Sequence, residues 1–281
     1  MSTLTADPPM TSPAANPPAA AQVHPTFAGV MRGEWIKLLS QRSTWWALAS
    51  TAAVITLVAL AAAMSLNAMT EDPTLAPGIE QMHGAEVIAG GFHFGMLTIA
   101  VLGALLITGE YATGMIRSTF TAVPRRLHVV GAKAAVFGVV ALVAMTLASF
   151  AAFYGAQIFL GPHGHGSSIS DPGALRSVAG AGLYLTLVGL LGAGTGWIVR
   201  STAGAITALV GLLLILPNLI PLLGSWADRL TRYMPSNAGE SFITSTRMPD
   251  ALTPVTGIGV LTLWVAAAFV AAVVLVRRRD A

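Results

Sequence analysis

Charged side chains gather in one short stretch, GEYATGMIRSTFTAVPRR (109–126), of a chain that is otherwise apolar. Its glutamate and three arginines could orient a partner protein by charge. Residues 111–123 have helical spacing with the apolar side chains on one side, and Pro124 ends the pattern. An amphipathic helix outside the membrane places that face on lipid or on a partner. The candidate contact residues are Glu110, Tyr111, Met115, Ile116, Arg117, Phe120, Arg125 and Arg126. The alternative is that the arginines only anchor the loop on the inner side of the membrane.

No other stretch has a catalytic or metal-binding pattern that would make the chain an enzyme. Only Lys37 and Lys133 are lysines, and neither is followed by Ser or Thr, so a P-loop cannot form and ATP must be bound elsewhere. The chain has no cysteine, which excludes disulfides and thiolate metal sites. His163 and His165 could bind a metal ion, but histidines in a glycine-rich loop are usually solvated. We therefore expect no catalytic residue, metal or cofactor in this chain.

The elements that carry these residues are predicted to be membrane-spanning helices. The 281 residues are 54% hydrophobic and 10% charged, with a mean hydropathy of +0.72, which exceeds what one soluble core can bury. A span needs about 20 mostly apolar residues, because lipid offers no partner for backbone groups. Six segments meet this requirement, at about 45–66, 87–108, 129–160, 177–199, 203–223 and 254–276. The fold class is therefore an all-α integral membrane protein.

The segment before the first span is predicted to have two parts. Residues 1–25 are rich in Pro and Ala and indicate a disordered cytoplasmic tail, while 26–281 form a single six-span domain. From Thr26, a plausible N-cap, an amphipathic helix follows. Its predicted apolar face carries Phe27, Met31, Trp35, Leu38 and Leu39. We expect this helix to lie along the inner leaflet.

The arginines and lysines predict the orientation. With both termini inside, eleven of the fifteen lie on the cytoplasmic side and four, at Arg176, Arg229, Arg232 and Arg247, lie outside. The basic pI of about 9.7 is thus a signal of membrane topology, and a nucleic-acid partner is not needed to explain it. We expect a multi-pass protein of a bacterial cytoplasmic membrane.

Two stretches resemble a known family. The run GEYATGMIRSTFTAVPRRLHVVGAK (109–133) is similar to the inner-loop signature of type-2 ABC exporter permeases. In that signature a glutamate ends the second span, a short helix and a Pro-Arg turn follow, and a lysine opens the third span. The run RGEWIKLLSQRSTWW (32–46) resembles the elbow of actinobacterial members of the family. The long N-terminal tail is a departure from the family pattern.

The resemblance implies a mechanism and partners. Residues 111–123 would be a coupling helix that sits on a separate ATPase subunit, and that subunit, in two copies, would bind ATP and Mg. Two copies of the permease, or one copy and a close paralogue, would enclose the pathway. The turn Arg200, Ser201 and Thr202 would be a second inner contact. Residues 224–250 would form short outer helices.

Two other functions stay open, an ion-coupled secondary transporter and a membrane scaffold that transports nothing. Ion coupling normally needs ionisable groups within the spans. The polar residues noted there are few, and the pathway candidates are Asn218, Gln157, Tyr154 and His93. The G-x-x-x-G motif at Gly192 and Gly196 predicts close helix packing, within the subunit or across a dimer.

Overall fold

The computed structural model describes residues 26–70, 84–244 and 251–278, and all regular structure in these ranges is helical. The predicted tail, 1–25, lies outside the described residues. The elements are α1 (Phe27–Ser40), α2 (Arg42–Thr70), α4 (Gly84–Ala112), α5 (Met115–Ala122), α6 (Arg126–Leu160), η1 (Gly161–His163), α7 (Ala174–Val199), α8 (Thr202–Val210), η2 (Gly211–Ile215), α9 (Leu216–Leu219), η3 (Ile220–Leu223), α10 (Ser225–Thr231), α11 (Pro235–Ile243) and α12 (Pro254–Arg278).

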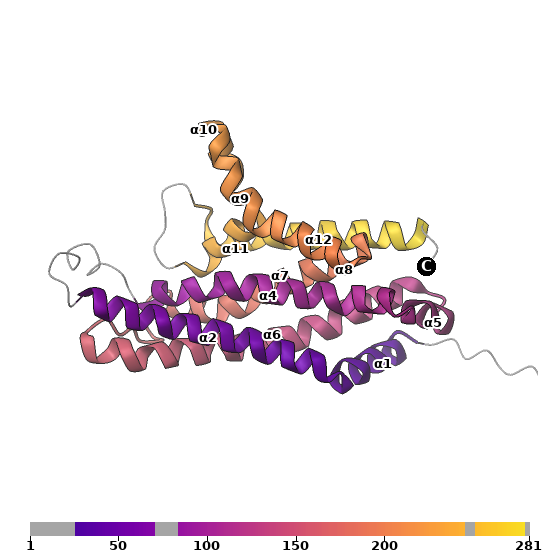
Figure 1. Cartoon of the computed structure of the whole chain (residues 1–281), viewed down its shortest axis with the longest axis horizontal. Helices are drawn as coiled ribbons and strands as arrows, with labels where there is room; N and C mark the ends of the chain where they lie inside the picture. Colours follow the sequence, from indigo (N-terminus) through magenta and orange to yellow (C-terminus); the bar gives the residue numbers. More distant parts are fainter. Residues whose placement is uncertain (1–25, 71–83, 245–250, 279–281) are drawn as a thin grey trace, which may run out of the picture.

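Six helical segments are long and apolar enough to cross a membrane, which confirms the predicted fold class. They are Arg42–Met69, Gly91–Ala112, Arg126–Leu160, Ala174–Val199, Thr202–Leu223 and Pro254–Arg278. Each differs from the predicted span by only a few residues at its ends. In Figure 1 they lie roughly along the long axis of the molecule, with α1, α5 and the end of α12 at one end and α10 and α11 toward the other. We call the first of these the basic end.

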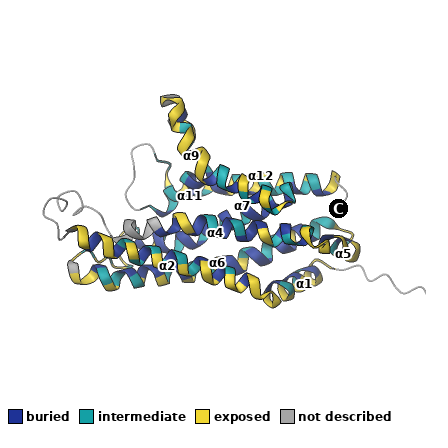
Figure 2. Ribbon diagram, viewed as in Figure 1, coloured by how far each residue is buried: buried dark blue, intermediate teal, exposed yellow. Residues whose placement is uncertain are grey.

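The centre of the bundle is built by α4, α6 and α7, in each of which half or more of the most apolar stretch is buried. Figure 2 shows many dark blue, buried residues along these helices. Glycine allows α4 and α7 to pack closely. A Cβ atom on Gly192 would lie 2.0 Å from the carbonyl oxygen of Ala100, and one on Gly103 would lie 2.0 Å from that of Gly189. The predicted G-x-x-x-G contact is therefore made within the chain, between these two helices.

The fifth span is irregular. It runs from α8 through the π-helical turn η2 to α9 and η3, and its outer part turns away from the bundle toward α10 (Figure 1). Pro217 and Pro221 each remove a backbone donor here, which accounts for the break in regular helix. The α11 helix then packs against α7 and α12, so residues 224–244 do contain the short helices expected there.

The α1 helix begins as predicted. Thr26 is its N-cap, and its side-chain oxygen accepts a hydrogen bond from the backbone N–H of Gly29 at 3.2 Å. Of the predicted apolar face, Phe27, Trp35 and Leu39 are exposed, as a lipid-facing surface would be. Leu38 is a correction, because it is only 4% exposed and lies on the packed side of the helix. The opposite side of α1 packs against α6, and it carries an unexpected buried residue, Glu34.

Candidate functional site

Four charged side chains form a buried cluster at the basic end, contributed by three helices. Glu34 and Lys37 come from α1, Glu110 from α4 and Lys133 from α6. The Nζ atom of Lys133 donates to Oε2 of Glu34 at 2.5 Å and to Oε1 of Glu110 at 2.9 Å. Lys37 donates to the same oxygen of Glu110. The charges alternate along the cluster and their sum is zero.

Most of this cluster is buried, and its ion pairs therefore fix the position of α1. The side chain of Lys133 is 3% exposed and that of Glu110 is 5% exposed, whereas that of Lys37 is 27% exposed. Two buried carboxylates share Lys133, so removing that lysine would leave charge without compensation. The cluster therefore specifies how α1 is held against α4 and α6.

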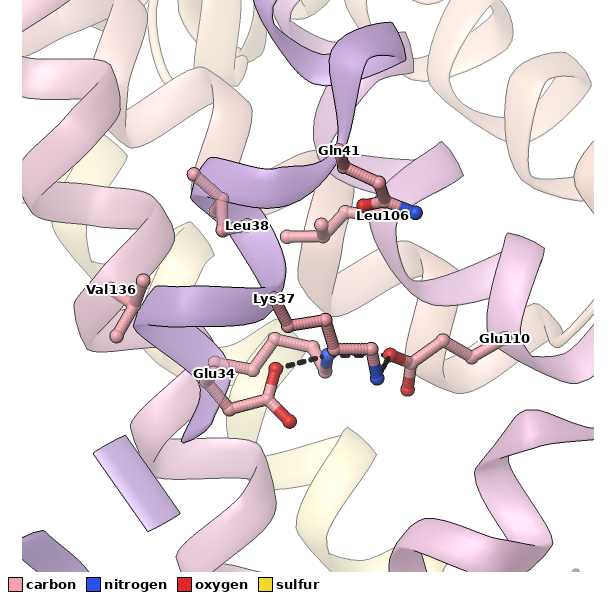
Figure 3. Close-up of a pocket in the computed structure, with 8 residues that line it drawn as sticks. Glu34, Lys37, Leu38, Gln41, Leu106, Glu110 and Val136 are labelled. Carbon is pink, nitrogen blue, oxygen red and sulfur yellow. Dashed lines mark hydrogen bonds and ion pairs between the residues drawn. The ribbon is translucent and has the colours of Figure 1, made fainter. Parts of the chain in front are cut away.

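The space around the cluster is too small for a substrate. Figure 3 shows Lys37 of α1 reaching toward Glu110, with Glu34 one turn away on the same helix. Leu38, Gln41, Leu106 and Val136 complete the lining of the cavity. The enclosed cavity measures about 10 Å³, close to what a single water molecule needs. The Oε2 atom of Glu110 is buried and has no hydrogen-bond partner among the residues that the structure describes. This arrangement can transmit or resist movement of α1, but it cannot hold a solute.

Sequence reasoning assigned Glu110 to a different contact. From the sequence alone, Glu110 could pair with a nearby arginine such as Arg117 or with a cation of a partner, or it could cap the short helix at its N-terminus. The structure shows a different pairing within the chain, because Glu110 pairs with Lys37 and Lys133. The predicted cap is also corrected, since the N-cap of α5 is Gly114 with φ +71°. A signal was available in the sequence: Lys133 lies within an apolar helix, where a lysine needs a partner.

The short helix α5 begins at Met115, four residues later than predicted, and its apolar side faces inward. Ile116 is 2% exposed and Phe120 is 9% exposed. The ring of Phe120 stacks on that of Trp197, with centroids 6.3 Å apart. The expectation that Ile116 and Phe120 insert into a partner is therefore corrected, because the chain's own core already covers them. Met115 and Arg117 remain on the exposed side.

Two of the predicted arginines hold the end of α12. Arg126 donates to the carbonyl of Val276 at 3.0 Å and lies over the ring of Phe120. Arg200, with φ 60°, ends α7, lies over the ring of Tyr111 and donates to the carbonyl of Leu275 at 3.4 Å. These donors satisfy carbonyls of the last helical turn.

In the rest of the turn after α7, one residue is hydrogen-bonded to α4 and one is exposed. Thr202 donates to the hydroxyl of Thr108 on α4 at 3.0 Å. Ser201 is exposed, as is Arg125 before α6. These residues lie at the basic end with α5, so the two predicted inner contacts belong to one end of the molecule.

The four pathway candidates make separate contacts and do not form one site. Tyr154 is 55% exposed and stacks with neighbouring rings of α6. Gln157 accepts a hydrogen bond from the backbone of Ser167, and Asn218 donates to a carbonyl of its own helical segment. His93 lies 3.4 Å from a carboxylate oxygen of Glu240 on α11.

A scan against protein-family models and a search of curated proteins gave no match to this chain. The resemblance to type-2 ABC exporter permeases therefore rests on the two sequence stretches themselves. What the chain can be called from its structure is a multi-pass helical membrane protein.

Proposed function

We propose that this chain is the membrane subunit of an ATP-driven exporter, energised by a separate ATPase subunit that binds ATP and Mg. One observation carries the proposal. The two stretches that resemble the exporter permeases are more than sixty residues apart, yet they supply all four members of the charge cluster beside α5. Glu34 and Lys37 come from the first stretch, and Glu110 and Lys133 from the second.

The exposed side of α5 is the surface that we assign to the ATPase. Met115, Arg117 and Ser118 are exposed there, whereas Ile116 and Phe120 fasten the helix to α7. A helix anchored in this way moves together with the bundle, so force applied to its outer face reaches the spans. Ser201, exposed in the turn after α7, would be part of the second contact.

Two copies of the chain, or the chain and a close paralogue, would enclose the pathway. The fifth span leaves an apolar face available for such a partner, because only 17% of its most apolar stretch is buried, compared with 67% for α7. In this proposal both termini lie in the cytoplasm and the basic end faces the ATPase.

The proposal can be tested with charge-reversed variants of the chain purified from its native membrane. Wild type should bring an ATPase subunit with it in equal amount. Arg117→Glu, on the exposed side of α5, should weaken that association, most strongly at low salt, because rim charges act mainly through long-range attraction. Arg229→Glu is the matched control, since it reverses an exposed arginine of α10 toward the other end.

Three readouts separate the outcomes of this experiment. The unfolding temperature should be the same for both charge variants. Phe120→Ala should lower the unfolding temperature, because that ring is buried. Equal ATPase association in the two charge variants would refute the assignment of α5. Full transport driven by an ion gradient, with no ATPase present, would refute the exporter.

An ion-coupled secondary transporter is the second candidate, and the structure gives it a specific observation. The third span contains the buried Lys133, and His93 of the second span faces Glu240. Ionisable groups in such positions are costly and often functional. The ion-gradient readout above distinguishes this candidate from the exporter.

A further inference from the structure

A hollow lined by basic residues lies at the basic end, separate from the charge cluster. Its volume is about 440 Å³, and it is open to one side. Its polar lining consists of three arginines and a histidine, namely Arg125, Arg126, Arg277 and His128. Pro124 and Leu127 complete the lining. They come from the start of α6 and the end of α12, two elements about 150 residues apart in sequence. The hollow therefore forms only when the fold brings the start of α6 and the end of α12 together.

The first turn of α6 adds to the positive potential of this hollow. Arg125 occupies the N-cap position and makes no side-chain capping hydrogen bond. The N-terminus of a long helix carries a partial positive charge and has backbone N–H groups without partners in the helix. No ion pair between two described residues includes Arg125 or Arg277. The charges converging here suit an anion of phosphate type.

The lengths of the two helices place the hollow at the level of lipid headgroups. At 1.5 Å per residue the 35 residues of α6 span about 52 Å, whereas a bilayer with its headgroups is about 40–45 Å thick. The start of α6 must therefore reach or pass the headgroup region. The α12 helix ends beside it, and its Val270 and Val274 are exposed just before Arg277. An apolar surface thus continues from the basic hollow toward the membrane interior.

We propose that this hollow binds the headgroup of an anionic phospholipid, with the phosphate between Arg125 and Arg277 and the acyl chains along α12. The exposed valines distinguish this ligand from a soluble phosphate, because only a lipid would use both the charged and the apolar surface. The inference does not depend on the ATPase. It assigns the hollow to the leaflet that we identify as cytoplasmic.

The test is lipid binding to the purified full-length chain, measured by native mass spectrometry with phosphatidylglycerol and with phosphatidylcholine. Wild type should retain phosphatidylglycerol preferentially. The double variant R125Q/R277Q should bind it about 25-fold more weakly, since each arginine near an anionic surface contributes about a factor of five. The matched control R32Q/R42Q removes two exposed arginines at the same end that do not line the hollow, so it should weaken phosphatidylglycerol binding clearly less than R125Q/R277Q does.

Each remaining outcome decides against the proposal. An equal loss in the two double variants would mean that overall charge, and not the hollow, attracts the lipid. Equal retention of the two lipids would mean that the hollow does not recognise the charge of the headgroup. Displacement of phosphatidylglycerol by inorganic phosphate would indicate a soluble anion site, and protection of Arg277 by the ATPase alone would indicate an acidic protein partner. The single variant R277Q, at an exposed helix end, serves if the double variant does not fold.

Discussion

At the scale of single residues, Lys133 carries the largest predicted effect. It is the shared cation of Glu34 and Glu110, and all three side chains are buried. Lys133→Met should lower the free energy of unfolding by about 3–5 kcal/mol, because it leaves the buried carboxylate of Glu34 without the cation it binds and leaves Glu110 with only the partly exposed Lys37. Unfolding in detergent, followed by temperature or denaturant, measures this loss.

Lys37 provides the comparison within the same cluster. Its side chain is partly exposed and contacts only Glu110, so Lys37→Met should cost clearly less. An equal loss in the two lysine variants would mean that Lys133 is not the central member of the cluster. A loss near zero in both would mean that the cluster does not stabilise the fold.

These residues also show where sequence reasoning ends. The Thr26 cap was predictable because its partner lies three residues away. The partners of Lys133 lie 99 and 23 residues away, and no local pattern connects them. A buried lysine in an apolar helix signals that a carboxylate must be near. It does not say which one, because that depends on the packing of α1 against α6.

At the scale of elements, the contact between α4 and α7 should be the most sensitive to added volume. A methyl group on Gly192 would meet the backbone of Ala100 at 2.0 Å, and backbone cannot yield as a side-chain end can. Gly192→Ala should therefore force the two helices apart, at a cost of about 1–3 kcal/mol or more. Thermal unfolding in detergent is the measurement.

Gly259 of α12 is the matched control, because a Cβ atom there would meet nothing within 4 Å. Gly259→Ala should leave the unfolding temperature unchanged or raise it slightly, since alanine is the better helix former. If Gly192→Ala were tolerated equally well, α4 and α7 would not be packed as closely as described.

The spans were predictable to within a few residues because apolar length alone decides them. The surface against which the apolar side of α5 packs could not be predicted in this way. Its apolar side had two available surfaces, a partner and the chain's own core, and the spacing of Ile116 and Phe120 is the same in both cases. In the structure the ring of Phe120 stacks on Trp197, so the apolar side of α5 packs on the chain's own core.

At the scale of the whole molecule, burial is unevenly distributed among the spans. The second, third and fourth spans have 61%, 50% and 67% of their most apolar stretches buried, against 28%, 17% and 22% for the first, fifth and sixth. The exposed faces are apolar, which suits lipid and a second copy alike, because both offer apolar contacts. Composition could therefore predict that these helices span a membrane, but not what surrounds them.

The orientation of the molecule is the last prediction, and it follows from charge. Eleven of the fifteen arginines and lysines are assigned to the cytoplasmic side, and nine remain when Lys37 and Lys133, each bound to a glutamate, are subtracted. Nine against four is still a clear asymmetry. An even number of spans, such as the six candidates in the described residues, would place both termini on one side. The basic end should therefore face the cytoplasm.

Because the chain has no cysteine, single introduced cysteines report this orientation without background. Ser40 and Ser118 are exposed on α1 and α5 at the basic end, and Ser168 is exposed in the loop between η1 and α7. In intact cells an impermeant maleimide should label Ser168→Cys alone, and after permeabilisation it should label all three variants. Labelling of Ser118→Cys in intact cells would invert the topology, and α5 would then lie where no ATP-hydrolysing partner could reach it.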